Sequence, residues 1–330
     1  MSDVKNVLVT GGTGFLGSNL AASLLEQGCK VRILRRPGSD LRAIGTLDVE
    51  HALGDVRDIG SLLKAMKGCD TVFHTAAVIS HWRKERPLMF DVNIAGTRNV
   101  VEACLQLGIR RLIHTSSTAA VGFPEHGSLA DETCRFNWEP YDVGYRISKH
   151  QAEMEIHRGV KLGLDAVMVN PTVIIGPRDI HFHGGQLIRD IYKRKIFYYV
   201  RGGMSVVYVD DVVQGHLLAA RYGRTGERYI LSGENLSRRE IITTIAEIVG
   251  GIKPLFRMPT SLINIVTTSS EFIADVLQRR PWVTRELLAG TDLNYHISCR
   301  RAQSDLGYTF IPFREAVEKT FTWYRTHGLL

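Results

Sequence analysis

Residues 7–18 read VLVTGGTGFLGS, a short apolar run that passes through regularly spaced glycines into a helical pattern. In a G-x-x-G-x-x-G spacing, one glycine permits a tight turn, the next lets the backbone approach a pyrophosphate, and the last lets the helix pack closely on the strand. A second strand pattern follows at Lys30–Leu34, which completes the strand, turn, helix and strand context that a dinucleotide-binding turn requires. A Walker-type nucleotide site is disfavoured, because Ser18 stands where that motif requires a lysine.

Short apolar runs and helical patterns continue to alternate through the first third of the chain. The runs lack polar alternation, as at Val7–Val9, which is typical of parallel strands covered on both faces. We therefore predict an α/β fold class with a Rossmann-type doubly wound parallel sheet. The expected strands are Asn6–Val9, Lys30–Leu34, Thr71–His74 and Arg111–Thr115, and the expected helices are Ser18–Gln27, Ile59–Met66 and Asn93–Leu107.

The second half of the chain carries fewer strand patterns. A helix is expected at Ser148–Lys161 and a strand at Ala166–Val169, after which two prolines break the pattern. The apolar run Ser205–Val209 indicates a return to the sheet, and Arg228–Leu231 indicates one more strand. From Ser237 onward the pattern predicts a smaller, mostly helical C-terminal substrate domain. We expect a nucleotide-binding domain of residues 1–170 and 206–233 and a substrate-binding domain of residues 171–205 and 234–330.

The composition is that of a globular protein, since 44% of the 330 residues are hydrophobic and 23% are charged. The formal charge of +7 is concentrated in the C-terminal half: residues 171–330 hold 21 basic and 15 acidic residues, against 20 and 19 in residues 1–170. The basic residues form short clusters rather than long blocks, so nucleic acid is not an expected partner. The excess of basic residues is compatible with an anionic substrate or a membrane surface as a partner. A homodimer is also compatible with the sequence.

The five cysteines are scattered without a C-x-x-C pair, so we expect reduced thiols. The N-terminus has no signal-peptide pattern, and no apolar run approaches the ~18 residues of a membrane span. We therefore expect a cytoplasmic protein without an integral membrane segment. Residues 193–199 combine a basic cluster with aromatic residues, which suits a membrane surface or, as we prefer, a substrate-pocket wall.

The end of the second strand is the position that selects between the two nicotinamide dinucleotides. An acidic residue there binds the ribose hydroxyls of NAD, whereas an arginine pairs with the 2′-phosphate of NADP. The chain has Arg35 and Arg36 at this point, and no carboxylate until Asp40. A guanidinium group can bind a phosphate through two hydrogen bonds, so the sequence favours NADP(H) over NAD(H).

Tyr145 and Lys149 begin a helical run and lie on one face of it, because residues four apart are neighbours on a helix. An ammonium beside a phenol stabilises the phenolate and brings the phenol pKa toward neutrality, which suits acid-base catalysis. Residues 113–122 run from a strand end into small hydroxylated residues, and a serine there can donate to a substrate carbonyl. A helix N-cap or a turn is the alternative role for such a serine.

Together these features resemble the extended short-chain dehydrogenase/reductase superfamily, also called the NAD-dependent epimerase/dehydratase family. Within it, the sequence is most similar to the branch of dihydroflavonol reductase-like and hopanoid-associated sugar epimerase-like proteins. The resemblance covers essentially the whole chain. Its other matching stretches are Gly54–Asp58, Thr75–Ala77, Asp91–Thr97, Asn170–Val173, Gly176–Ile180, Tyr208–Val212 and Gly226–Leu231.

The resemblance implies a role for each matching residue. Ser117 polarises the substrate carbonyl, Tyr145 is the general acid, and Lys149 is the partner of the tyrosine and a ribose ligand. Asn93 takes a structural role first and a proton-relay role second. The implied cofactor-binding residues are Gly11, Thr13, Gly14, Phe15, Leu16, Gly17, Arg35, Arg42, Asp55, Val56, Ala76, Ala77, Tyr145, Lys149, Pro171, Thr172, Val173 and Ile174.

The resulting function is an NADP-dependent oxidoreductase that transfers a hydride to a ketone or aldehyde of a small organic substrate. The alternative is a nucleotide-sugar epimerase or dehydratase that retains NAD(P). Family dehydratases usually have Thr-Asp-Glu at the catalytic position, and the sequence from Ser117 to Ala119 departs from that.

Two further features stay outside this assignment. His181 and His183 could offer two imidazoles to a metal, but the spacing suggests no third ligand, so we expect no metal site and prefer a loop over the substrate. His81 and Trp82 follow a strand end, where they either line a substrate pocket or cap a helix.

Overall fold

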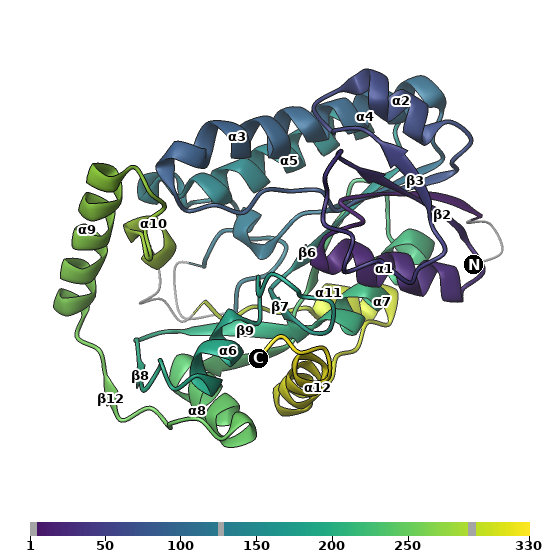
Figure 1. Cartoon of the computed structure of the whole chain (residues 1–330). Helices are drawn as coiled ribbons and strands as arrows, with labels where there is room; N and C mark the ends of the chain where they lie inside the picture. The colour runs from purple at the N-terminus through teal and green to yellow at the C-terminus, as the bar shows by residue number, and fades with distance from the viewer. Residues whose placement is uncertain (1–4, 125–128, 290–294) are drawn as a thin grey trace.

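A seven-stranded parallel sheet forms the centre of the protein in a computed structural model that describes residues 5–124, 129–289 and 295–330 (Figure 1). The strands run in the order β10-β6-β5-β4-β1-β2-β3. They are β1 (Asn6–Thr10), β2 (Lys30–Arg35), β3 (Glu50–Leu53), β4 (Thr71–His74), β5 (Arg111–Thr115), β6 (Ala166–Pro171) and β10 (Arg228–Leu231). The strand order reverses beside β1, where ligands bind at the carboxyl ends of the strands in such sheets. The predicted Rossmann-type fold class is confirmed.

Helices cover both faces of this sheet. The side chains of β1 alternate between two buried clusters, with Val7 and Val9 in one and Leu8 in the other. This alternation explains the continuous apolar run, because both faces of the strand are buried. One face carries α2 (Ile59–Met66), α4 (Gly96–Leu107) and α5 (Gly144–Lys161), and the other carries α1 (Phe15–Glu26), α7 (Val209–Tyr222) and α11 (Arg300–Leu306). The short helix α3 (Arg86–Phe90) precedes α4.

The remaining elements form a second region beside the carboxyl ends of the main strands. A three-stranded sheet has the order β11-β9-β7, and two short strands, β8 and β12, pair with each other. The strands are β7 (Val173–Ile175), β8 (Tyr198–Tyr199), β9 (Gly203–Tyr208), β11 (Glu234–Ser237) and β12 (Phe256–Arg257), and the helices are α6 (Gln186–Tyr192), α8 (Arg238–Val249), α9 (Thr260–Leu277), α10 (Arg285–Leu288) and α12 (Phe313–Thr326).

One expectation about this region is wrong. The run that we expected to rejoin the main sheet forms β9, which pairs with β7 and β11 instead. The chain returns to the main sheet only through α7 and β10. An apolar run indicates a buried strand but does not specify the sheet to which the strand belongs, and for this reason the prediction was wrong. The division into two domains at the stated boundaries remains a prediction.

Candidate active site

The turn from β1 into α1 fits closely against the loop after β4. Gly11 has a φ of 69°, and a Cβ atom there would lie 2.8 Å from the backbone of Ala76. A Cβ atom on Gly17 would overlap the carbonyl oxygen of Gly11. Gly14, which has no side chain, is the N-cap of α1, so the first N–H groups of the helix stay available to an anion. These features fit the pyrophosphate of a dinucleotide.

Two of the predicted phosphate-binding arginines differ in how they are engaged. Arg35 lies at the end of β2, and its Nε donates to Nδ1 of His51 at 2.9 Å, which leaves its terminal nitrogens for another acceptor. Arg42 pairs with Asp40, at 2.6 Å between Nη2 and Oδ2, and this pair lowers the pKa of Asp40 to about 2. Arg36 is exposed beside them. Arg42 is thus engaged by a carboxylate, whereas no ion pair joins Arg35 or Arg36 to another of the described residues.

The loop between β3 and α2 holds the residues predicted to contact the adenine. Asp55 forms an ion pair with Arg57 at 2.8 Å, which lowers the pKa of the aspartate. Val56 is buried, and a Cβ atom on Gly96 would lie 2.7 Å from its Cγ2. The carbonyl of Val56 accepts a hydrogen bond from Asn99 at 3.0 Å. These contacts fix the loop against α4.

Ser117 lies where the chain leaves β5, and Tyr145 lies in the first turn of α5. The Ser117 hydroxyl accepts a hydrogen bond from the N–H of Ala119 at 3.1 Å, so the serine caps the short helix Thr118–Ala120. Burial raises the pKa of Tyr145, while the neighbouring Ser117 hydroxyl and the charge of Arg146 oppose that rise.

The ammonium group of Lys149 has a different partner from the tyrosine that we predicted. The lysine is almost fully buried, and its Nζ donates to the carbonyl oxygen of Thr115 at 2.8 Å. Its charge is therefore not among the causes that lower the pKa of Tyr145, contrary to our prediction. Burial lowers the pKa of Lys149 itself to about 8, and the carboxylate of Glu153 opposes that shift.

Glu153 is a residue that the sequence analysis missed. It is buried, and its Oε1 accepts hydrogen bonds from Oγ of Ser116 at 2.5 Å and from Nδ2 of Asn170 at 2.6 Å. Its Oε2 pairs with Nη1 of Arg228 at 3.2 Å. The signal was present, because Glu153 follows Lys149 by one further four-residue step on the same face of α5.

Asn93 lies in a π-helical turn, Asp91–Ala95, directly before α4. Its side chain bonds both backbone polar groups of Val78, at 2.8 and 2.9 Å, and donates to Oγ of Ser148 at 3.0 Å. That hydroxyl in turn donates to the carbonyl oxygen of Tyr145 at 2.8 Å. Asn93 thus joins the loop that carries Ala76 and Ala77 to the catalytic helix, which is the structural role predicted first.

A cavity of about 300 Å³ lies beside the tyrosine. It is lined by residues 81–83, by one side of α9 and by α10 and the segment before it. The ring centroid of His81 is 6.2 Å from that of Tyr145. Nδ1 of His81 lies 3.9 Å from Oε1 of Glu286, and both atoms are buried without a hydrogen-bond partner among the described residues. His81 and Trp82 therefore line a pocket, the first of the two roles that we considered, and Glu286 was missed.

The residues after β6 lie near the second sheet. Oγ1 of Thr172 accepts a hydrogen bond from Ser205 at 3.4 Å, and Val173 is exposed. Their contact with the nicotinamide, like that of Pro171 and Ile174, remains a prediction. His181 lies with its Nε2 3.5 Å from Oδ2 of Asp40.

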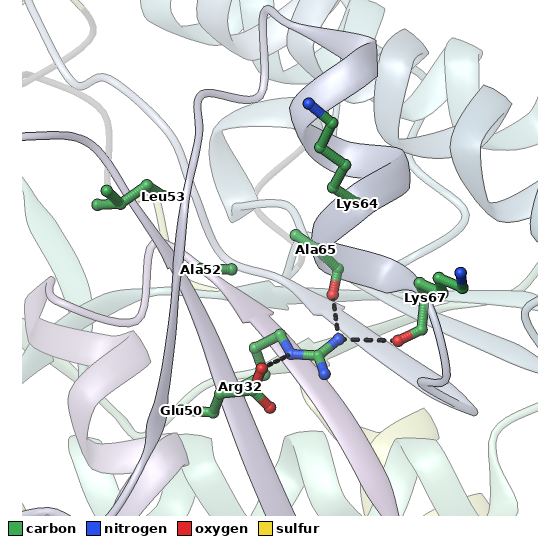
Figure 2. Close-up of a pocket in the computed structure, with 7 residues that line it drawn as sticks. All are labelled: Arg32, Glu50, Ala52, Leu53, Lys64, Ala65 and Lys67. Carbon is green, nitrogen blue, oxygen red and sulfur yellow. Dashed lines mark hydrogen bonds and ion pairs between the residues drawn. The ribbon is translucent and has the colours of Figure 1, made fainter.

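A second cavity, of about 320 Å³, lies between β2, β3 and α2 (Figure 2). Arg32 projects into it, with Nε 2.8 Å from Oε1 of Glu50 and Nη1 donating to the carbonyls of Ala65 and Lys67 at 2.6 and 2.9 Å. None of the predicted catalytic residues lines either cavity, but His81 of the first cavity lies with its ring centroid 6.2 Å from that of Tyr145. The first cavity is therefore the candidate substrate pocket.

Comparison with known proteins agrees with this geometry. The model of the NAD dependent epimerase/dehydratase family matches residues 7–232. The chain is 35% identical to a putative dihydroflavonol 4-reductase of Synechocystis sp., over 97% of this chain and 94% of that protein. It is 34% identical to sterol demethylase protein B of Methylococcus capsulatus, over 98% and 99% of the two chains.

Among solved structures, the crystal structure of gox2253 matches with a TM-score of 0.87 and 38% sequence identity, covering 99% of both chains. The fold, the matched residues and the relatives all lead to the superfamily that the sequence resembles. The chain belongs to the NAD dependent epimerase/dehydratase family, within the extended short-chain dehydrogenases/reductases.

Proposed function

We propose that the protein is an NADPH-dependent reductase of ketones or aldehydes. The observation that carries this proposal is the position of Ser117 at the carboxyl end of β5, close enough to Tyr145 for its hydroxyl to lower the pKa of the phenol. A carbonyl-orienting hydroxyl and a proton donor are thus neighbours, and the ring of Tyr145 lies 6.2 Å from that of His81, which lines the cavity. NADPH, when bound along the glycine turn, supplies the hydride.

The side chains of the protein orient the substrate carbonyl and protonate its oxygen. The Ser117 hydroxyl donates to the substrate carbonyl oxygen and orients it, and the hydroxyl of Tyr145 gives that oxygen its proton. A raised pKa keeps Tyr145 protonated at neutral pH, which suits a general acid. Lys149, whose ammonium donates to the carbonyl oxygen of Thr115, would hold the ribose of the cofactor in the same region.

The proposed preference for NADPH rests on Arg35 and Arg36. Both lie at the end of β2 or just after it, and the first carboxylate beyond them, Asp40, is already paired with Arg42. A 2′-phosphate at this point would therefore meet guanidinium groups without an unpaired carboxylate to repel it.

The cavity supports a substrate with an apolar body and one hydrogen-bonding group. Trp82 offers apolar surface, whereas His81 and Glu286 offer buried polar atoms that need a partner. The names of the two relatives above, a dihydroflavonol reductase and a sterol demethylase protein, fit ring systems of this kind.

The second candidate is an epimerase or dehydratase that retains its cofactor, which the name of the family supports. One experiment separates the two. Purified protein is heat-denatured and the released nucleotide is identified, while a parallel sample is assayed for NADPH consumption with ketones and aldehydes. NADPH consumption by protein free of nucleotide supports the reductase, and its loss in Tyr145→Phe ties it to this site. Stoichiometric bound NAD without NADPH consumption would refute the reductase.

A further inference from the structure

Helix α9 presents its apolar side chains to solvent. The exposed apolar residues are Leu262, Ile265, Val266, Phe272, Ile273, Val276 and Leu277. Their spacing of three and four residues places them on one stripe of a helix about 27 Å long. The buried residues of α9 are instead Thr267, Ser270 and Ala274. A surface helix normally buries its apolar side, so the arrangement is inverted.

Specific contacts hold α9 in this orientation. Oγ of Ser270 accepts hydrogen bonds from the N–H groups of Trp282 and Val283 at 3.1 and 3.2 Å. Glu271 pairs with Arg285 at 2.7 Å. These bonds use the polar side of the helix, so the apolar stripe is displayed outward. Figure 1 shows α9 at the outer edge of the molecule, beyond α10.

Positive charge flanks the stripe at both ends. Arg257 lies just before α9, and Arg279 and Arg280 lie just after it; all three are exposed, and Arg280 lies 3.6 Å from a carboxylate oxygen of Glu85. Trp282 follows and is 84% exposed. An apolar helical stripe with flanking cations and an exposed tryptophan is complementary to a bilayer surface with anionic headgroups.

We propose that α9 docks the protein on the surface of a bilayer that contains anionic lipid. Among the described residues, none of the helices has the length and apolarity needed to span a bilayer. A second copy of the chain fits less well. A two-fold contact between two α9 stripes brings Arg257 close to Arg279 or brings each arginine close to its own copy, and both arrangements set like charges together.

The docked orientation places the cavity behind the lipid-facing helix. Thr268 and Glu271 of α9 line the cavity that reaches His81, whose ring lies against Tyr145. A helix with one side on the bilayer and the other on the active-site cavity gives a membrane-dissolved substrate a short path to the catalytic residues. Docking itself does not depend on the proposed reaction, because it uses none of the catalytic groups.

The test is flotation of the full-length protein with vesicles of phosphatidylcholine, with and without phosphatidylglycerol. We expect binding to the anionic vesicles that weakens as salt is added. The double variant Ile265→Ser/Val276→Ser should lower the partition coefficient on the order of a hundredfold, because two buried aliphatic side chains are lost. Arg279→Gln should lower it about fivefold. Leu162→Ser, an equally exposed position at the end of α5, is the matched control and should leave binding unchanged.

Two companion measurements distinguish loss of membrane binding from loss of folding or of activity. Circular dichroism verifies that the variants are folded, and reduction of a water-soluble aldehyde should be equal in the double variant and the wild type. Absence of wild-type flotation, or flotation that the double variant retains, would overturn the proposal. Sedimentation that shows a wild-type dimer and a monomeric double variant would assign the stripe to a second copy and also overturn it. Flotation without any reductase activity would leave docking supported and refute only the proposed function.

Discussion

Replacing Glu153 by glutamine should move the pH profile of the reductase. Lys149 has a pKa lowered by burial to about 8, and the carboxylate of Glu153 opposes that lowering. Removing the carboxylate removes an attraction that favours the ammonium, so the pKa of Lys149 falls further. If the protonated lysine is the active form, the alkaline limb of kcat/KM moves to lower pH.

The magnitude follows from the helix geometry. Side chains four residues apart place the two charges roughly 6 Å apart, and at an effective dielectric constant of about 20 their attraction is about 2.8 kcal/mol, or about 2 pKa units. Arg228, at 3.2 Å from the same carboxylate, cancels part of this attraction. We therefore expect a shift of about 1 unit toward lower pH in Glu153→Gln.

The assay is kcat/KM for NADPH-dependent carbonyl reduction across the pH range, with thermal unfolding followed in parallel. Glu155→Gln is the matched control, because Glu155 lies on the same helix but pairs with Arg98 and Arg158 at 2.7 and 2.9 Å. Glu153→Asp keeps the charge and should keep the alkaline limb near its original position. An unmoved limb in a folded Glu153→Gln protein, or a limb moved to higher pH, would refute the electrostatic role of Glu153.

Three further predictions concern the tyrosine, the cofactor phosphate and the glycine turn. Tyr145→Phe should lower kcat by about 10²- to 10⁴-fold while the Kd for NADPH, measured by fluorescence titration, stays nearly unchanged. Arg35→Ala should weaken NADPH binding about tenfold to a hundredfold and NADH binding little, and equal losses for both would show that the phosphate is bound elsewhere; Arg36→Ala measures the share of the neighbouring cation. Gly17→Ala should lower the Tm, because the new Cβ overlaps the turn, whereas Gly45→Ala, whose Cβ would make only an ordinary contact at 3.6 Å, should leave the Tm nearly unchanged.

The sequence predicted the central elements closely where the periodicity was strong. Helix Ile59–Met66 and strand Thr71–His74 have the predicted bounds. The edge strand Glu50–Leu53 was missed, because it is largely exposed and polar and so lacks the apolar run of a buried strand. Helix α5 begins at Gly144, before the predicted Ser148, so Tyr145 lies within its first turn.

Only the part of the candidate active site that depends on spacing within one helix could be predicted. Tyr145 and Lys149 share a helix face, which a four-residue spacing reveals. The partners of Glu153 come from the residue after β5, from β6 and from β10. The carboxylate that faces His81, that of Glu286, lies about two hundred residues away along the chain. Contacts between such distant segments depend on the order of the strands and on the packing of the second region, which local patterns do not encode.

The basic surplus of the C-terminal half can now be assigned to particular surfaces. The cations that line the active-site cavity are already neutralised, since Arg83 pairs with Asp275 and Arg285 pairs with Glu271. An anionic substrate would find little uncompensated positive charge there. At the ends of α9, by contrast, no ion pair is recorded for Arg257 or Arg279 within the described ranges. Part of the excess charge therefore lies on the outer surface beside the apolar stripe, where our proposal places a bilayer with anionic headgroups.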